Sequence, residues 1–292
     1  MREAVRDAVR SGDKVLVEGF THLISFAAGH EIIRQEIRDL TAVRLTPDLV
    51  TDQLVEAGCI KKLVFSWTGN PGVGSLHSVR RAVEKKKSLL LEEYSHFGMV
   101  SRLQAGAQGL PFGMLRNYAG TDYPEINPEI RSVLCPYTGE MLTTVPALRP
   151  DVAIIHVQRA DVQGNAQVWG LLGTQKEAAF AAERVVIVCE EIVSTEKIRS
   201  DPNRTLIPGI RVSHVVHEPW GCHPSYAQGF YDRDNDFYVQ WDEISRTEEG
   251  SRKYLDEFVY GVADRAAYLK KLPELSRLKA KPRVSSGVDY GY

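Results

Sequence analysis

A carboxylate, a glycine and a histidine stand together where a predicted strand ends. The apolar run at residues 14–17 has the length and β-branched character of a buried strand, and it is followed by Glu18, Gly19, Phe20, Thr21 and His22. Open α/β sheets bind ligands at the carboxyl ends of their strands, so this turn is placed where a site is expected. Gly19 would let a substrate approach the backbone, and N–H groups of the following helix start could hold an anion or a developing oxyanion. A plain strand-to-helix turn that needs glycine for its dihedral angles would also have this sequence.

A second loop with Gly, Pro and Asn follows another predicted strand. Residues 67–75 include Trp67, Asn70 and Ser75 and precede a predicted helix, so the loop could face a ligand at the same sheet edge. A Gly/Pro connector explains the same composition equally well. The chain has neither the GxGxxG pattern of dinucleotide binding nor the GxxxxGK[ST] pattern of a P-loop.

His96 lies in a third strand-to-helix junction, residues 92–98, together with two carboxylates and a hydroxyl group. An imidazole titrates close to neutral pH, so His96 could transfer a proton or bind a substrate group, although a lone histidine is more often structural. The histidines at positions 214, 217 and 223 match no zinc pattern, and we predict no metal site.

The elements that would position these residues alternate between strands and helices, which predicts an α/β fold with an open, largely parallel sheet and flanking helices. The expected strands are residues 14–17, 42–45, 62–65, 89–91, 152–156, 185–189 and 212–216. The expected helices are residues 1–10, 25–38, 48–57, 79–86, 98–107 and 176–182, the last with a capping-box spacing of Thr174 and Glu177. We expect a single domain over residues 1–292, with a long loop excursion near 118–143 and a polar C-terminal tail after Leu272.

Composition narrows the function classes. The chain has 292 residues, 43% of them hydrophobic, and a formal net charge of -2, so nothing draws it to nucleic acid. No window has the apolar length of a signal peptide or a membrane span, and Cys59, Cys135, Cys189 and Cys222 are dispersed without CxxC pairs. We expect a cytoplasmic protein without membrane contact that acts on small molecules or binds protein partners.

Short motifs along the whole chain resemble, in their order, those of a known protein family. In the second half they fall at residues 151–156, 164–165, 169–170, 189–193, 198–202, 207–209, 221–225 and 231–235, and in the first half at 19–21, near 70, at 93–95 and at 109–112. In this order they resemble the A-type subunit of the glutaconate CoA-transferase group in the class I CoA-transferase family. The resemblance covers about residues 11–272.

The resemblance implies the fold of that family and an active site shared with a B-type CoA-transferase subunit, in a heterodimer or heterotetramer. It implies CoA transfer between an acyl-CoA and a carboxylate, with coenzyme A as a substrate and no bound cofactor. In that group the glutamate that takes the acyl group, and then forms a glutamyl-CoA thioester, belongs to the B-type subunit. This chain would contribute Gly19, Phe20, Thr21, His22, Trp67, Asn70 and Ser75 to substrate binding, with His96 and Glu18 as candidate catalytic groups.

The sequence departs from the family pattern at several positions. Glu18 replaces a glycine, residues 24–26 replace a later part of the same signature, Pro71 stands where the glutaconate enzymes have a hydroxyl residue, and His96 replaces other polar residues. Glu18 is therefore either a new acid–base group or a structural carboxylate. An apolar Pro71 favours a bulkier or less charged acyl group than a dicarboxylate.

Two alternatives stay open. The same fold serves relatives that hydrolyse, decarboxylate or cleave rings in acyl-CoA substrates, and the steroid-ring enzymes among them depend on an acidic residue near the position of His96. The chain could also be a non-catalytic binding subunit whose partner does the chemistry.

Overall fold

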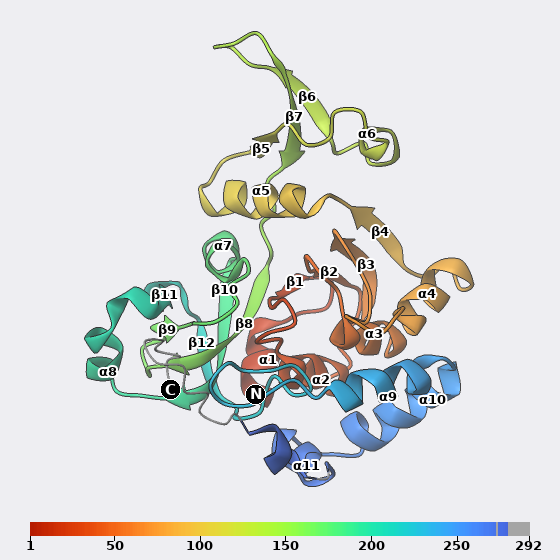
Figure 1. Cartoon of the computed structure of the whole chain (residues 1–292), viewed down its shortest axis with the longest axis vertical. Helices are drawn as coiled ribbons and strands as arrows, with labels where there is room; N and C mark the ends of the chain where they lie inside the picture. Colours follow the sequence, from red (N-terminus) through yellow and green to blue (C-terminus); the bar gives the residue numbers. More distant parts are fainter. Residues whose placement is uncertain (273, 280–292) are drawn as a thin grey trace.

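A largely parallel sheet lies at the centre of the computed structural model, which describes residues 1–272 and 274–279 (Figure 1). The parallel strands follow the order β12-β10-β8-β1-β2-β3-β4, and the short strands β9 and β11 extend the sheet antiparallel at the end of β8. Their bounds are β1 (Lys14–Val17), β2 (Leu40–Val43), β3 (Ile60–Phe65), β4 (Leu90–Glu93), β8 (Val152–Ala160), β9 (Ala166–Gln167), β10 (Arg184–Ile192), β11 (Thr205–Ile207) and β12 (His214–His217). The predicted open, largely parallel α/β fold is confirmed.

Alternating side chains of the central strands enter two separate cores. In β1, Val15 and Val17 belong to one buried cluster and Leu16 to the other, as the period of two along a strand requires. Both faces are apolar, which explains why the strands read as continuous hydrophobic runs.

Helices cover both faces of the sheet (Figure 1). One layer, with Val15 and Val17, contains α1 (Arg2–Ala8), α2 (Phe26–Arg34), α3 (Leu49–Glu56), α4 (His77–Glu84), α9 (Asn235–Ser245) and α10 (Glu248–Leu255). The other layer, with Leu16, contains α5 (His96–Ala107) and α7 (Gln175–Ala181). Shorter elements complete the chain: α8 (Thr195–Ser200), α11 (Arg265–Lys270), a π-helical turn η3 (Asp256–Tyr260), and the 3-10 turns η1 (Pro202–Arg204), η2 (Gly209–Arg211) and η4 (Leu275–Leu278).

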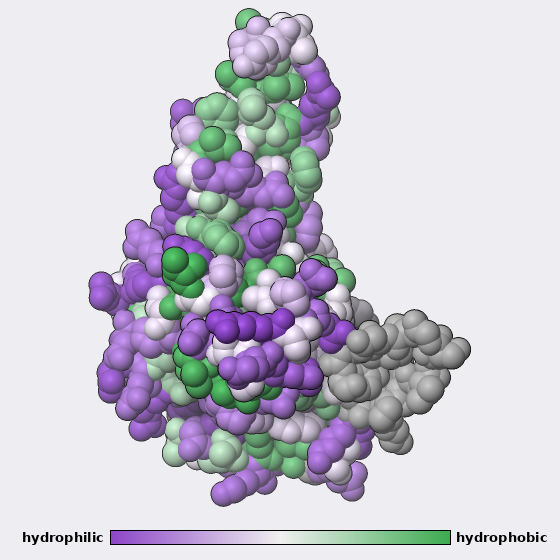
Figure 2. Space-filling view, turned by 90° about the vertical axis from the view of Figure 1, so that its left-hand side faces the viewer, coloured by the Kyte–Doolittle hydropathy of each residue, from purple (hydrophilic) through white to green (hydrophobic). Residues whose placement is uncertain are grey.

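An arm stands away from the main sheet beyond α5 (Figure 1). It is a three-stranded antiparallel sheet in the order β5-β7-β6, made of β5 (Phe112–Leu115), β6 (Arg131–Leu134) and β7 (Met141–Pro146), with α6 (Tyr123–Ile126) beside it. The region 118–143, predicted as a long loop, therefore contains regular structure. Its strands are too short to show a recognisable periodicity, and Pro, Gly and Asn are frequent in the segments between them. Figure 2 shows this arm as a narrow projection that carries apolar side chains at its surface.

Element ends differ from the predictions by at most four residues, and one predicted cap does not form. Thr174 precedes α7 but makes no side-chain capping bond, and its backbone N–H donates to Glu18 instead. The polar tail predicted after Leu272 lies mostly outside the described residues. Within the described part of the chain, no helix combines the length and the apolar character that crossing a membrane requires.

Candidate active site

Residues that follow β1, β2 and β4 meet around one cavity of about 260 Å³. Because these strands run parallel with β3 between them, the residues after each strand emerge at the same edge of the sheet. The cavity is lined by Val17, Glu18, Gly19, Phe20, Arg44, Leu45, Thr46, His96, Leu171, Leu172 and Gly173. The structure thus brings together four of the predicted site residues: Glu18, Gly19, Phe20 and His96.

The Gly19 turn has a backbone that an L-residue would not adopt readily. Gly19 has a φ of 134°, and Thr21 and Leu23 both have a φ of 55° although they carry side chains. A Cβ at Gly19 would lie 2.8 Å from the His22 carbonyl oxygen and 2.8 Å from Ile24 Cγ1. Sparsely populated backbone conformations persist where the surroundings enforce them, and they cluster at functional sites.

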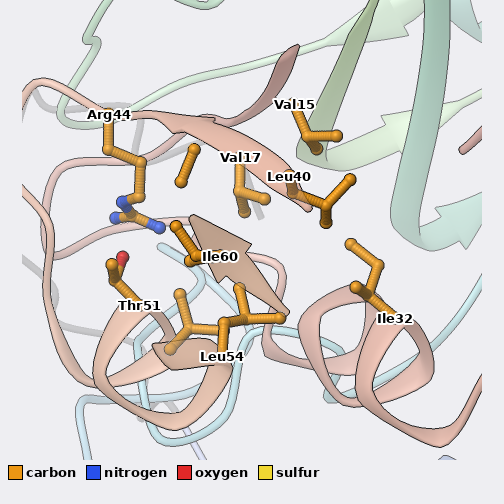
Figure 3. Close-up of a pocket in the computed structure, with 10 residues that line it drawn as sticks. Val15, Val17, Ile32, Leu40, Arg44, Thr51, Leu54 and Ile60 are labelled. Carbon is orange, nitrogen blue, oxygen red and sulfur yellow. The ribbon is translucent and has the colours of Figure 1, made fainter. Parts of the chain in front are cut away.

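Arg44 holds this turn in place. Its Nη2 donates to the Gly19 carbonyl oxygen at 3.1 Å and pairs with Asp48 Oδ2 at 3.4 Å. Figure 3 shows the Arg44 side chain reaching from the end of β2 into the apolar layer beside Val17 and Thr51, where the packing leaves a void of only about 10 Å³. That void is a packing defect of the core and too small for a ligand. The Arg44 side chain, which is 3% exposed, binds the Gly19 carbonyl oxygen and Asp48.

Glu18 is buried at the floor of the cavity with 5% of its surface exposed. Its Oε1 accepts the backbone N–H of Thr174 at 2.8 Å. Burial raises the pKa of the Glu18 carboxyl above its usual range, while the Thr174 N–H bond and the nearby Arg44 charge act in the opposite direction. This hydrogen bond fixes the position of the cavity wall formed by Leu171–Gly173, which directly precedes Thr174.

His22 holds the other end of that wall. Its Nδ1 donates to the Leu171 carbonyl oxygen at 2.9 Å, and its Nε2 accepts the Gln228 N–H at 3.1 Å. Burial lowers the pKa of His22 to about 4, so the ring is neutral, and it does not line the cavity. Thr21 is also outside the lining, and its carbonyl oxygen accepts the Ser225 hydroxyl at 2.6 Å.

His96 opens α5 at the rim of the cavity and is exposed. Its Nδ1 lies 2.8 Å from Ser66 Oγ, and its ring meets Phe20 edge-on with centroids 6.3 Å apart. Ser66 follows β3 directly and was not identified from the sequence, where a single serine after a strand gives no distinguishing signal.

The second predicted loop is nearby but does not line the cavity. Asn70 is buried and its Nδ2 donates to the Tyr238 carbonyl oxygen at 2.7 Å, which ties the loop to α9. Arg233 donates to the Pro71 carbonyl oxygen at 2.7 Å. Trp67, with 47% of its surface exposed, and Ser75 lie at the surface.

A buried polar cluster lies elsewhere in the core, around the end of β10. His156 Nε2, Tyr231 Oη and the backbone N–H of Trp220 all contact the Glu190 carboxylate, at 2.5 to 2.8 Å. His156, Glu190 and Cys222 bring ligand-type atoms within 4.8 Å of one another. The Glu190 oxygens already accept these hydrogen bonds, and burial raises the pKa of the Cys222 thiol well above its ordinary value, so the cluster has the character of a structural network rather than of a metal centre.

Comparisons with known proteins match nearly the whole length of the chain. A family profile described as Coenzyme A transferase matches residues 1–218. The chain is 51% identical to the A-type subunit of the 3-oxoadipate CoA-transferase of Pseudomonas knackmussii, over 94% of this chain and 97% of that protein. It superimposes on the crystal structure of glutaconate coenzyme A-transferase from Acidaminococcus fermentans with a TM-score of 0.90 at 34% identity, covering 96% of this chain and 95% of that one.

A more distant relative has another activity in its name. It is the cholesterol ring-cleaving hydrolase IpdA subunit of Mycobacterium tuberculosis, which is 28% identical over 89% of this chain and 93% of its own length. The fold therefore occurs in proteins named for CoA transfer and in at least one protein named for hydrolysis.

Proposed function

The chain belongs to the coenzyme A transferase family, and from this premise we propose that it is the A-type subunit of a heteromeric CoA-transferase, which forms its active site together with a B-type partner. The observation that carries the proposal is the cavity at the carboxyl edge of the sheet. Among the described residues that line it, the one carboxylate is Glu18, which is buried and hydrogen-bonded to Thr174. An acyl-sized cavity without an accessible carboxylate of its own fits a reaction in which the partner supplies the nucleophile.

The size of the cavity favours the acyl group as its occupant. Pockets that enclose drug-sized ligands measure about 300 to 1,000 Å³, so a cavity of about 260 Å³ is suited to a short acyl chain rather than to a whole acyl-CoA. Phe20, Leu171 and Leu172 supply its apolar walls, and each has more than 40% of its surface exposed. Those surfaces are available to the substrate and to the partner.

The names of two relatives support a dicarboxylic acyl group. The relatives of 51% and 34% identity are named for 3-oxoadipate and glutaconate, which are both dicarboxylic acids. This replaces the less charged acyl group expected from Pro71, because Pro71 lies outside the cavity lining and its apolar ring gives no information on the occupant.

In the reaction that we propose, a glutamate carboxylate of the B-type partner attacks the thioester carbonyl carbon. This step forms an acyl-glutamyl anhydride and breaks the C–S bond, so that the electron pair leaves with CoA as a thiolate. The thiolate then attacks the glutamyl carbonyl, which releases the acyl group as a free carboxylate and leaves glutamyl-CoA. A second carboxylic acid reverses both steps and leaves as its CoA thioester, so no cofactor is required and coenzyme A is a substrate.

In this scheme the Gly19 turn contributes the backbone that lies closest to the reacting carbonyl, with Arg44 holding its geometry. Phe20 and His96 contact the acyl group. The other predicted site residues act indirectly: His22 and Glu18 hold the wall at Leu171–Gly173, Thr21 connects the turn to Ser225, and Asn70 anchors the neighbouring loop that carries Trp67 and Ser75.

A second candidate activity is hydrolysis or decarboxylation of an acyl-CoA on the same fold. The observation in its favour is the hydrolase relative, at 28% identity. The 51% identity to a transferase subunit weighs more heavily, because that alignment is both closer and more complete. A non-catalytic role for this chain would leave substitutions in the cavity without effect on turnover.

CoA exchange by the reconstituted complex tests the proposal. We expect this chain, co-expressed with its B-type partner, to transfer CoA between succinyl-CoA and a panel of free carboxylic acids with ping-pong kinetics, whereas neither chain by itself transfers any. Free thiol and thioester are followed separately. Release of free CoA without formation of a new thioester would contradict transfer and support hydrolysis.

A further inference from the structure

Ser66 holds the ring of His96 through a short chain of hydrogen bonds. Ser66 Oγ lies 2.6 Å from the Leu45 carbonyl oxygen and 2.8 Å from His96 Nδ1. The serine hydroxyl has a single proton, and two oxygens 2.6 Å apart require a proton between them. That proton is therefore donated to Leu45, and Ser66 Oγ accepts the Nδ1–H of His96.

This proton count fixes what His96 presents to the cavity. In the neutral ring, Nδ1 carries the proton, so Nε2 carries only a lone pair. In the imidazolium form, Nε2 becomes a charged N–H donor. Nε2 has no hydrogen-bond partner among the described residues, while the ring lines the cavity beside Phe20.

The other charged groups of the cavity are buried and have partners within the protein. Arg44 donates through Nη2 to the Gly19 carbonyl oxygen and pairs with Asp48, although its buried Nε and Nη1 have no hydrogen-bond partner among the described residues. Glu18 accepts the Thr174 N–H. His96 differs from both because it is exposed at the rim of the cavity, with Nε2 free of any partner among the described residues.

The carboxylates on β4, next to His96, have partners of their own. At the end of β4, Glu93 accepts the Tyr123 hydroxyl at 3.0 Å. Glu92 is held by ion pairs with Lys62 and, from within α5, with Arg102. The start of α5 adds the positive end of a helix dipole, which favours an anion beside His96.

We propose that the His96 imidazolium, oriented by Ser66, binds the distal carboxylate of a dicarboxylic acyl group and so determines the specificity of the transferase. The inference rests on the proposed function and assigns the residue that recognises its substrate class. A charged N–H donor at the rim of the cavity, beside Phe20, would discriminate a carboxylate from a methyl group at the same chain length.

Two matched acids test the inference in the reconstituted complex. 3-Oxoadipate and 3-oxohexanoate have the same chain length and differ at the far end, where one has a carboxylate and the other a methyl group. At saturating succinyl-CoA, we expect His96→Leu to raise the KM for 3-oxoadipate about tenfold relative to that for 3-oxohexanoate, because leucine offers no N–H donor to the distal carboxylate. An unchanged ratio would overturn the inference, whereas absence of transfer to both acids would overturn the proposed function.

Further variants separate carboxylate binding by His96 from a merely structural role. His96→Gln keeps an N–H donor without the charge, so it is expected to raise the KM ratio less than His96→Leu does. Ser66→Ala removes the group that orients the ring and is expected to raise the ratio in the same direction. Ser88→Ala, at an exposed serine before β4, is the matched control for Ser66 and should leave the ratio unchanged. A wild-type KM ratio in both the His96 and the Ser66 variants would contradict the assignment.

Discussion

Replacing Gly19 by alanine is expected to lower kcat/KM for CoA transfer about 100-fold, because the turn next to the reacting carbonyl cannot keep its shape. The φ of 134° is unfavourable for any L-residue, and a Cβ there would lie 2.8 Å from the His22 carbonyl oxygen and 2.9 Å from that of Leu23. Both contacts are with backbone, so neither is relieved by rotating a side chain. We expect the variant to lose about 1 to 3 kcal/mol of unfolding free energy, measured by denaturant titration beside the kinetic assay.

Gly12→Ala is the matched control for this effect. Gly12 also has a positive φ, 92°, but a Cβ at this position would have no heavy atom within 4 Å. It lies in the turn before β1, at the opposite end of the strand from the cavity. We expect a small loss of stability and unchanged transfer. Equal kinetic losses in the two variants would show that general strain, rather than the shape of the Gly19 turn, reduces activity.

Replacing Glu18 by alanine is expected to have the second largest effect, again about 100-fold in kcat/KM. The substitution leaves the buried Thr174 N–H without its acceptor and removes a negative charge that interacts with Arg44. An unsatisfied buried donor costs about 1 to 3 kcal/mol, and here the cost falls on the wall formed by Leu171–Gly173. Kinetics of the reconstituted complex and thermal unfolding of this chain would measure the two consequences.

Glu18→Gln distinguishes the two roles left open for this residue. Glutamine keeps an oxygen that can accept the Thr174 N–H but cannot exchange a proton or carry charge. If Glu18 positions the wall, the glutamine variant keeps most of the activity, which is the result we expect. Activity as low as in the alanine variant would instead assign an acid–base role. Glu84→Ala, which removes an exposed ion pair with Arg80, serves as a control with little expected effect.

The parallel strands could be predicted from the sequence because burial on both faces makes them continuous apolar runs, as β1 and β8 illustrate. The arm was missed because its strands are short and mostly exposed, so that hydrophobic alternation is weak in β6. The ends of helices shift where local contacts compete with capping signals. Thr174 is the clearest case, since its N–H is taken by a carboxylate 156 residues away.

Part of the candidate site was also accessible from sequence. Glu18, Gly19 and His96 come shortly after strands, and a parallel sheet brings such positions to one edge. Ser66 and Arg44 could not be identified in this way, because their importance comes from hydrogen bonds across strands. His22 was grouped with the substrate-binding residues by its position in the chain, but two backbone hydrogen bonds hold its ring in the protein interior.

The most direct test is to find which of the two chains carries the covalent intermediate. The reconstituted complex is incubated with succinyl-CoA in the absence of an acceptor acid and treated with borohydride to reduce a glutamyl-CoA thioester, and each chain is then weighed by mass spectrometry. We expect a mass change on the B-type partner only, with this chain unmodified. A modified carboxylate on this chain, or free CoA with neither chain modified, would contradict the transferase mechanism proposed for it.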